Sequence, residues 1–181
     1  MATNRLKEHY NKEVKDKLQA ELKIDNVMAT PRLLKVVINV GAGEAATNKN
    51  VLDKIQEQIG WISGQKPVVT KARKSVAAFK IRKDLAIGVK VTLRGEKMYV
   101  FLDKLIGIVM PRIRDFRGIS ESTVDQSGNM NIGFNEQTIF PEIEFDKIDR
   151  IRGLQVTVVT NAKNREQGRK LFEMIGVPFK K

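Results

Sequence analysis

Four short segments alternate apolar and polar residues, and no other feature of the sequence limits the possible folds as strongly. They cover residues 33–41, 89–94, 129–134 and 154–159. Successive side chains of a strand point to opposite faces, so each segment predicts a β-strand with one apolar and one polar face. The apolar positions are Leu34, Val36, Ile38, Val40, Val89, Val91, Leu93, Met130, Ile132, Phe134, Leu154, Val156 and Val158. Such strands predict a sheet that is covered on one side and open on the other.

Other segments space their apolar residues as helices do, and they cover about residues 4–24, 48–62, 96–109 and 164–175. The first has an apolar residue at every fourth position from Leu6 to Leu22. Met110 and Pro111 are expected to stop the third helix, and Gly176 to stop the fourth. Strands mixed with such helices indicate an α+β or α/β fold. No repeat or linker interrupts the chain, so we expect one domain over residues 1–181.

The polar face of the predicted sheet carries almost no carboxylates. It displays Asn39, Lys90, Thr92, Gln155 and Thr157. A solvated sheet face is the simpler interpretation for any single strand. A solvated face normally mixes Glu with Lys, however, whereas amides and hydroxyls can bond phosphates, ribose 2′-hydroxyls and base edges. The face is therefore a candidate RNA-binding surface.

The positive charge is concentrated in the middle of the chain. The net charge is +12, and residues 61–120 alone carry 14 basic and 4 acidic side chains, a net charge of +10. A charge that served only solubility would be spread evenly. Its concentration indicates a polyanionic partner such as nucleic acid.

The most basic stretch, KARKSVAAFKIRK, spans residues 71–83 and contains six cations and no carboxylate. A solvated helix face is disfavoured because the cations would scatter around the axis. A nuclear-targeting signal is weakly indicated, since basic loops of nucleic-acid-binding proteins have similar sequences. Residues 79–82 alternate as a strand would, and we predict a basic loop between two strands.

Several classes of protein are disfavoured by composition. The chain has no cysteine, which removes disulfides and thiolate metal sites and is compatible with a reducing compartment. The charged N-terminus does not resemble a signal peptide, and no run approaches the ~18 apolar residues of a membrane span. We expect a cytoplasmic protein.

One motif imitates a nucleotide-binding loop. Residues 41–46, GAGEAA, match the dinucleotide fingerprint G-x-G-x-x-G/A. Glu44 would face the pyrophosphate, and the next helix begins several residues late, so we instead expect the glycines to let the backbone turn sharply. His9 has no partners for a catalytic triad, and the acidic residues Glu142, Glu144, Asp146 and Asp149 lack the spacing of a calcium loop. Trp61 and Tyr99 are expected in the core. We therefore expect no enzyme activity, cofactor or metal.

Longer blocks of sequence resemble a known family, the bacterial-type large-subunit ribosomal protein that is fifth in its series and binds 5S ribosomal RNA. The resemblance covers nearly the whole chain in order. The longest block is ISGQKPVVTKARKSVAAFKIRKDLAIGVKVTLRG at 62–95. The others are LLKVVINVGAGEA at 33–45, MPRIRDFRG at 110–118, IFPEIEFD at 139–146, RGLQVTVVT at 152–160 and GVPFKK at 176–181.

The resemblance implies one α+β domain, a mostly antiparallel sheet with helices packed on one face and an open polar RNA-binding face. It implies binding to 5S rRNA in the central protuberance of the large ribosomal subunit, and contact with 23S rRNA and other central-protuberance proteins. It also implies contact with the P-site tRNA and an intersubunit bridge to small-subunit ribosomal protein thirteen.

We expect three sets of site residues. The resemblance implies rRNA contacts at Asn39, Gln65 and Thr92, and we expect phosphate contacts from the cations Lys66, Lys71, Arg73, Lys90 and Arg94. The expected tRNA-proximal loop contains Lys74, Ser75, Val76, Ala77, Ala78, Phe79, Lys80 and Arg82. The expected bridge residues are Arg112, Arg114 and Asp115. Asn39 and Thr92 also lie on the polar face that the alternation predicts.

The chain departs from the family in one loop. Residues 125–130 read DQSGNM where the family usually has Asp-Gly-Arg-Gly-Asn-Tyr, and Asn135 replaces a usual Arg. Two family cations are therefore missing there, and contacts from this loop are not expected to carry over.

Overall fold

A computed structural model of the chain describes residues 4–46, 48, 50–144 and 148–180. The residues group into two compact units. The first unit comprises residues 1–36, 94–132 and 157–181, and the second unit comprises residues 37–93 and 133–156. The polar contacts described below each lie within one unit.

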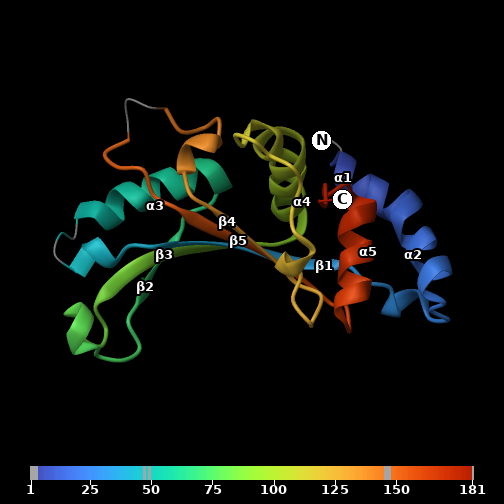
Figure 1. The fold of residues 1–181 in the computed structure, drawn as a ribbon, viewed down its shortest axis with the longest axis horizontal. Helices are drawn as coiled ribbons and strands as arrows, with labels where there is room; N and C mark the ends of the chain where they lie inside the picture. The colour runs from blue at the N-terminus through green and yellow to red at the C-terminus, as the bar shows by residue number, and fades with distance from the viewer. Residues whose placement is uncertain (1–3, 47, 49, 145–147, 181) are drawn as a thin grey trace. The chain divides into compact units, whose positions relative to one another are not determined.

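Five strands form one sheet in the order β2-β3-β1-β5-β4 (Figure 1). The strands are β1 (Leu33–Gly41), β2 (Val68–Lys71), β3 (Ala86–Leu93), β4 (Met130–Phe134) and β5 (Leu154–Thr160). Strands β2 and β3 are antiparallel, with Val68 opposite Lys90 and Thr70 opposite Gly88. The antiparallel sheet with helices confirms the α+β fold and excludes the parallel α/β alternative.

The predicted alternation of buried and exposed side chains is confirmed in β3, β4 and β5, where every predicted apolar position is buried. In β1, Val36, Ile38 and Val40 are buried as expected, but Leu34 is 39% exposed and Leu33 is buried instead. The alternation is interrupted between Leu33 and Val36, where two consecutive residues face away from the core. The prediction for Leu34 is therefore wrong.

In the first unit, the N-terminal helical segment consists of α1 (Arg5–His9), a π-helical turn (Tyr10–Val14) and α2 (Lys15–Leu22). Apolar residues spaced four apart drift by about 40° per step around an α-helix of 3.6 residues per turn. The wider π turn compensates for this drift, and Leu6, Tyr10, Val14 and Leu18 all remain buried. The side-chain hydroxyl of Tyr10 donates to the carbonyl of Pro31 at 2.9 Å.

The other two helices of the first unit begin near their predicted residues. Helix α5 (Arg165–Ile175) is capped by Asn164, and Gly176 ends it in the left-handed conformation, as predicted. Helix α4 (Gly95–Lys104) continues through a π turn (Leu105–Val109) and a 3-10 turn (Met110–Arg112). The wider helical segment ends at Val109, as predicted, and Pro111 lies in the first turn of the separate 3-10 turn, where a proline needs no N–H bond.

In the second unit, α3 (Asn50–Ser63) packs against β2 and β3 (Figure 1). Its residues Val51, Ile55, Ile59 and Ile62 are buried, as the sequence predicts. Gly88 is needed in β3, because a Cβ there would approach the carbonyl oxygen of Val40 to 2.8 Å. Short 3-10 turns complete the chain at Val27–Ala29, Gly43–Ala46, Ala77–Phe79, Glu121–Thr123 and Gln137–Ile139.

Candidate nucleic-acid interface

The open face of the sheet in the second unit is polar and free of carboxylates. Asn39 and Lys90 are exposed and Thr92 is half-buried, and none of the five strands that the structure describes contains Asp or Glu. The register of β2 and β3 places Val68 and Thr70 on the same face as Lys90. A polyanion could lie across this face without meeting a negative charge.

Glycines leave parts of this face without side chains. Gly41, Gly133 and Gly153 are exposed and alternate with buried residues of β1, β4 and β5. A Cβ added to Gly41 or Gly133 would meet no atom within 4 Å, and neither residue has a positive φ. The fold therefore does not require glycine at these two positions, and the bare backbone permits close approach of another molecule. We expected the glycines of residues 41–46 to let the backbone turn sharply. Neither Gly41 nor Gly43 has a positive φ, so the backbone conformation does not require glycine at either position.

Gln65 and Thr92, two of the expected rRNA contacts, lie together. The side-chain amide of Gln65 donates to the backbone carbonyl of Thr92 at 3.2 Å. The hydroxyl of Ser63 in turn donates to the carbonyl of Gln65 at 3.0 Å. Gln65 thus fixes the turn before β2 against β3, while the neighbouring Lys66 is exposed.

The basic stretch 71–83 extends the β2–β3 hairpin and is internally bonded. Ala72 donates to the carbonyl of Leu85 at 2.8 Å, and Val76 and Ile81 exchange backbone hydrogen bonds at 2.9 and 3.1 Å. The hydroxyl of Ser75 accepts from the N–H of Lys83 at 2.9 Å. The loop prediction is correct in position, but these bonds give the stretch a defined shape.

At the tip of the hairpin, residues 77–79 form a 3-10 turn and Lys80 is left-handed, with φ 53°. The strand-like alternation of residues 79–82 therefore does not form a strand, because the chain must reverse direction between Val76 and Ile81. The side chain of Phe79 is 73% exposed. The cations Lys71, Arg73, Lys74, Lys80, Arg82 and Lys83 are all exposed along the hairpin.

The expected bridge residues lie in the first unit, after α4. Arg112, Arg114 and Asp115 are all exposed, and Asp115 has a φ of 54°. The preceding residues are held by the N–H of Ile113, which donates to the carbonyl of Met110 at 3.1 Å. Arg94, the remaining expected rRNA contact, is exposed directly before α4.

The loop that departs from the family is nevertheless well bonded. The carboxylate of Asp125 accepts from the N–H groups of Ser127 and Asn129 and from the side-chain amide of Asn129. Burial opposes ionisation of Asp125, but the bonds from Asn129 and Ser127 outweigh it and lower the pKa of the carboxyl. Gly128 packs against Gly168, whose Cα would lie 3.3 Å from an added Cβ. These bonds and contacts give the loop a defined shape.

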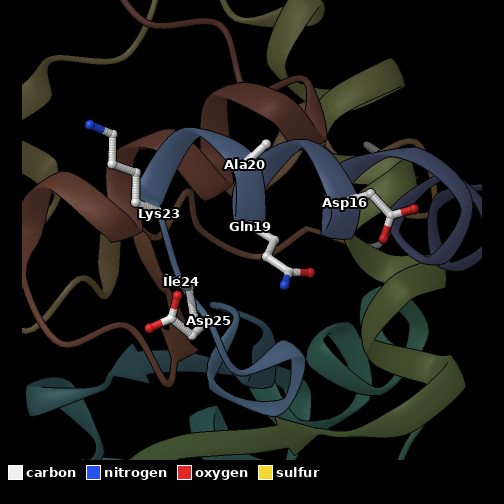
Figure 2. A pocket seen from close by; sticks show the side chains of 6 residues that line it. All are labelled: Asp16, Gln19, Ala20, Lys23, Ile24 and Asp25. Atoms are coloured by element: carbon white, nitrogen blue, oxygen red, sulfur yellow. The ribbon is translucent and has the colours of Figure 1, made fainter.

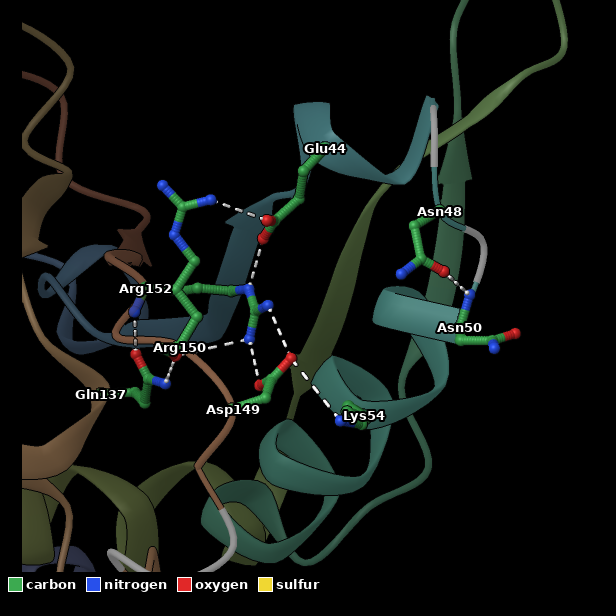
Figure 3. Close-up of polar contacts among 8 residues, drawn as sticks. All are labelled: Glu44, Asn48, Asn50, Lys54, Gln137, Asp149, Arg150 and Arg152. Atoms are coloured by element: carbon green, nitrogen blue, oxygen red, sulfur yellow. Dashed lines mark hydrogen bonds and ion pairs between the residues drawn. The ribbon is translucent and has the colours of Figure 1, made fainter.

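Glu44, in the segment that matches the dinucleotide fingerprint, accepts hydrogen bonds from two arginines (Figure 3). Arg152 Nε lies 2.6 Å from Glu44 Oε1, and Arg150 Nη1 lies 2.9 Å from Glu44 Oε2. A carboxylate held in this position would repel a pyrophosphate. Helix α3 also begins only at Asn50, too far from the glycines to offer its N-terminus.

Arg152 also donates to both oxygens of Asp149, at 2.7 and 3.0 Å. The hydrogen bond from Arg152 lowers the pKa of Asp149 from 3.8 to about 2, and it also lowers the pKa of Glu44. The bond to Asp149 in turn raises the pKa of Arg152. We call Glu44, Gln137, Asp149, Arg150 and Arg152 the arginine network. Sequence reasoning missed it, because nothing local pairs residues that are 108 positions apart.

The remaining candidates do not form a catalytic or metal site. Within the described residues no three His, Cys, Asp or Glu side chains are grouped to hold a metal ion. Asp146, one of the four acidic residues considered for a calcium loop, lies outside those residues. His9 is half-buried and pairs with the carbonyl of Met174 at 3.3 Å. Trp61 is 42% exposed, so its predicted place in the core is wrong, whereas Tyr99 is half-buried.

A hollow of about 550 Å³ lies at the end of α2. It is lined by Asp16, Gln19, Ala20, Lys23, Ile24 and Asp25, whose polar side chains spread apart instead of converging (Figure 2). It offers no nucleophile or paired acid and base. None of the helices in the described part of the chain is long and apolar enough to cross a membrane.

Comparisons with known proteins agree over nearly the whole chain. A family model described as ribosomal protein L5 matches residues 26–82, and a second model, which describes the C-terminus of the same ribosomal family, matches residues 86–179. The large ribosomal subunit protein uL5 of Syntrophomonas wolfei is 53% identical over 176 residues, covering 97% of this chain and 99% of the relative. The uL5 protein of Psychrobacter cryohalolentis is 54% identical with the same coverage.

This similarity confirms the predicted family and the expectation that the protein is not an enzyme. The chain belongs to the ribosomal protein L5 family and is a structural constituent of the large ribosomal subunit in the cytoplasm.

Proposed function

We propose that the protein binds 5S rRNA through the open face of its sheet and helps to attach it in the central protuberance, where it also contacts 23S rRNA. The observation that carries this proposal is the carboxylate-free face that displays Asn39, Lys90 and Thr92 beside bare glycine backbone. Lys90 neutralises phosphate charge, whereas Asn39 and Thr92 bond 2′-hydroxyls and base edges.

The glycines give the proposal a steric component. RNA lies close to Gly41 and Gly133, so that its sugar-phosphate backbone can approach the strands. No stacking aromatic lies in the described strands of this face, and recognition there depends on RNA shape and hydroxyl groups. Other RNA contacts come from Lys66, Lys71, Arg73 and Arg94, which are exposed, and from the turn that Gln65 fixes.

The basic hairpin contacts the P-site tRNA. Its support is the exposed Phe79 at the tip, which can pack on a base or ribose, with cations on both sides for the phosphates. The small residues Ser75, Ala77 and Ala78 are also exposed there, so the hairpin can approach an RNA surface closely.

The segment after α4 forms an intersubunit bridge to small-subunit ribosomal protein thirteen, through Arg112, Arg114 and Asp115. These residues are exposed and of both charges, so they suit a polar contact with a protein surface. The chain also contacts other proteins of the central protuberance.

The Gly133→Val variant tests the sheet proposal. The new side chain points into open space in a β-strand and should not reduce stability. It should lower the affinity for 5S rRNA by about tenfold, which corresponds to about 1.4 kcal/mol of lost contact. Filter binding measures the affinity, and thermal unfolding checks the fold.

Asn39→Ala is the polar counterpart and is also expected to weaken binding. The control is Glu57→Ala, which changes an exposed side chain of α3 and should bind 5S rRNA normally. Wild-type affinity in both Gly133→Val and Asn39→Ala would contradict the proposal.

A further inference from the structure

The arginine network lies where three strands begin or end. Glu44 follows the end of β1 by three residues, Gln137 follows the end of β4 by three residues, and Arg152 precedes β5 by two. All belong to the second unit. One cluster therefore ties three chain segments that are far apart in the sequence (Figure 3).

The hydrogen bonds of the arginine network fix the orientation of its side chains as well as their distances. The side chain of Arg152 is only 8% exposed, and its guanidinium uses Nε for Glu44 and both terminal nitrogens for Asp149. The side-chain amide of Gln137 donates to the carbonyl of Arg150 at 2.7 Å and accepts from the N–H of Arg152. A planar guanidinium fixes both position and orientation of its partners, which the single ammonium of a lysine cannot do.

The same strand ends carry the exposed glycines of the open face. Gly41 is the last residue of β1, Gly153 follows Arg152, and Gly133 is the second-to-last residue of β4. Glycine has no side chain to pack, and its backbone is more flexible than that of any other residue type. The placement of this bare backbone therefore depends on bonds made beyond the strand ends.

We propose that Arg152 and Glu44 are positioning residues for RNA binding: they hold the glycine-bearing ends of β1, β4 and β5 in the arrangement that fits RNA. The inference rests on the proposed function of the open face. Neither residue needs to touch RNA, since Arg152 is buried and directs its donors to carboxylates.

The network is expected to fix geometry more than to add net stability. Buried ion pairs often contribute little net stability, because removing charges from water offsets their attraction. A bidentate arginine with a bridging amide instead selects one geometry over others. The expected signature is a local loosening that changes RNA affinity while the protein remains folded.

The test uses Arg152→Lys in the full chain, with Glu44→Gln as a second variant in case the first does not fold. Hydrogen exchange is followed at the N–H of Ala42, which donates to the carbonyl of Ile87 at 2.8 Å just after β1. Its exchange should accelerate at least about tenfold through local opening. The N–H of Ala72, bonded to Leu85 in the hairpin of the same unit, should not change.

Affinity for 5S rRNA is then measured well below the unfolding temperature. It should fall about tenfold in each variant, with an unchanged slope of log affinity against log salt, because no phosphate contact is lost. Arg169→Lys, which alters an exposed ion pair with Glu121 at 2.8 Å in the first unit, is the matched control and should bind normally.

Unchanged exchange at Ala42 in both variants would overturn the inference. So would faster exchange with affinity within twofold of wild type, since the network would then be only a structural tie. A wild-type protein without 5S rRNA affinity would instead refute the proposed function, and the exchange data would still decide whether the network holds the strand ends.

Discussion

Asp149→Asn tests how strongly the arginine network depends on charge. The pKa of Asp149 falls from 3.8 to about 2, mainly because Arg152 donates to it. At about 1.4 kcal/mol per pH unit, this lowering corresponds to about 2 kcal/mol. The Asp149 side chain is 25% exposed and therefore partly screened by water, so we expect about 1 kcal/mol of lost stability at pH 7.

The expected loss depends on pH in a definite direction. A lowered pKa in the folded state stabilises the protein above the unfolded value near 4, and this stabilisation disappears as the pH falls toward 2. The pKa of Glu44 is lowered too, so its contribution disappears with falling pH as well. The stability difference between wild type and Asp149→Asn should therefore be full at pH 7 and 5, clearly smaller at pH 3, and nearly gone at about pH 2.

Urea unfolding at pH 7, 5 and 3 measures this difference. Glu173→Gln, an exposed change on α5 outside the network, is the control and should follow the wild type at every pH. A difference between wild type and Asp149→Asn that is as large at pH 3 as at pH 7 would refute the electrostatic argument.

Three further predictions concern the loop, the hairpin and the charge. Gly128→Ala should cost about 3 kcal/mol in chemical unfolding, since φ is 75° and the Cβ would lie 2.6 Å from that of Ala162; a cost below about 1 kcal/mol would contradict the geometry. Phe79→Ala should leave thermal stability unchanged, since the ring is exposed, but should weaken tRNA binding to reconstituted ribosomes; normal binding would exclude the ring from the contact. The log of 5S rRNA affinity should fall linearly with log salt, with a slope of roughly −3 to −5 for four to six phosphate contacts; a flat line would contradict the charge argument.

The strand faces could be predicted because alternation is a local property. Val89, Val91 and Leu93 are buried and Lys90 is exposed, as a period of two requires. The end of a helix could also be predicted where it depends on one local residue type. Gly176 ends α5 because glycine readily adopts the left-handed conformation. The carboxylate-free face could be predicted because the same alternation shows which side chains share a face. The family resemblance then indicated RNA as its partner.

Other features depend on neighbours that are distant in sequence. Trp61 has helical spacing, but burial depends on what covers its side of α3, and the ring remains 42% exposed. The residues 79–82 alternate like a strand, yet the hairpin needs a left-handed residue at Lys80. The sequence shows that Glu44 is unsuited to bind a phosphate, but it does not show that Glu44 pairs with Arg152, which is 108 positions away.

The central claim is that RNA lies on the open face of the sheet. A photo-crosslinking amino acid at Gln155, exposed in β5 on that face, tests it most directly when compared with the same group at Glu57, exposed on α3. In complexes with 5S rRNA, we predict crosslinks from position 155 and none from position 57. Crosslinks from position 57 alone would contradict the account.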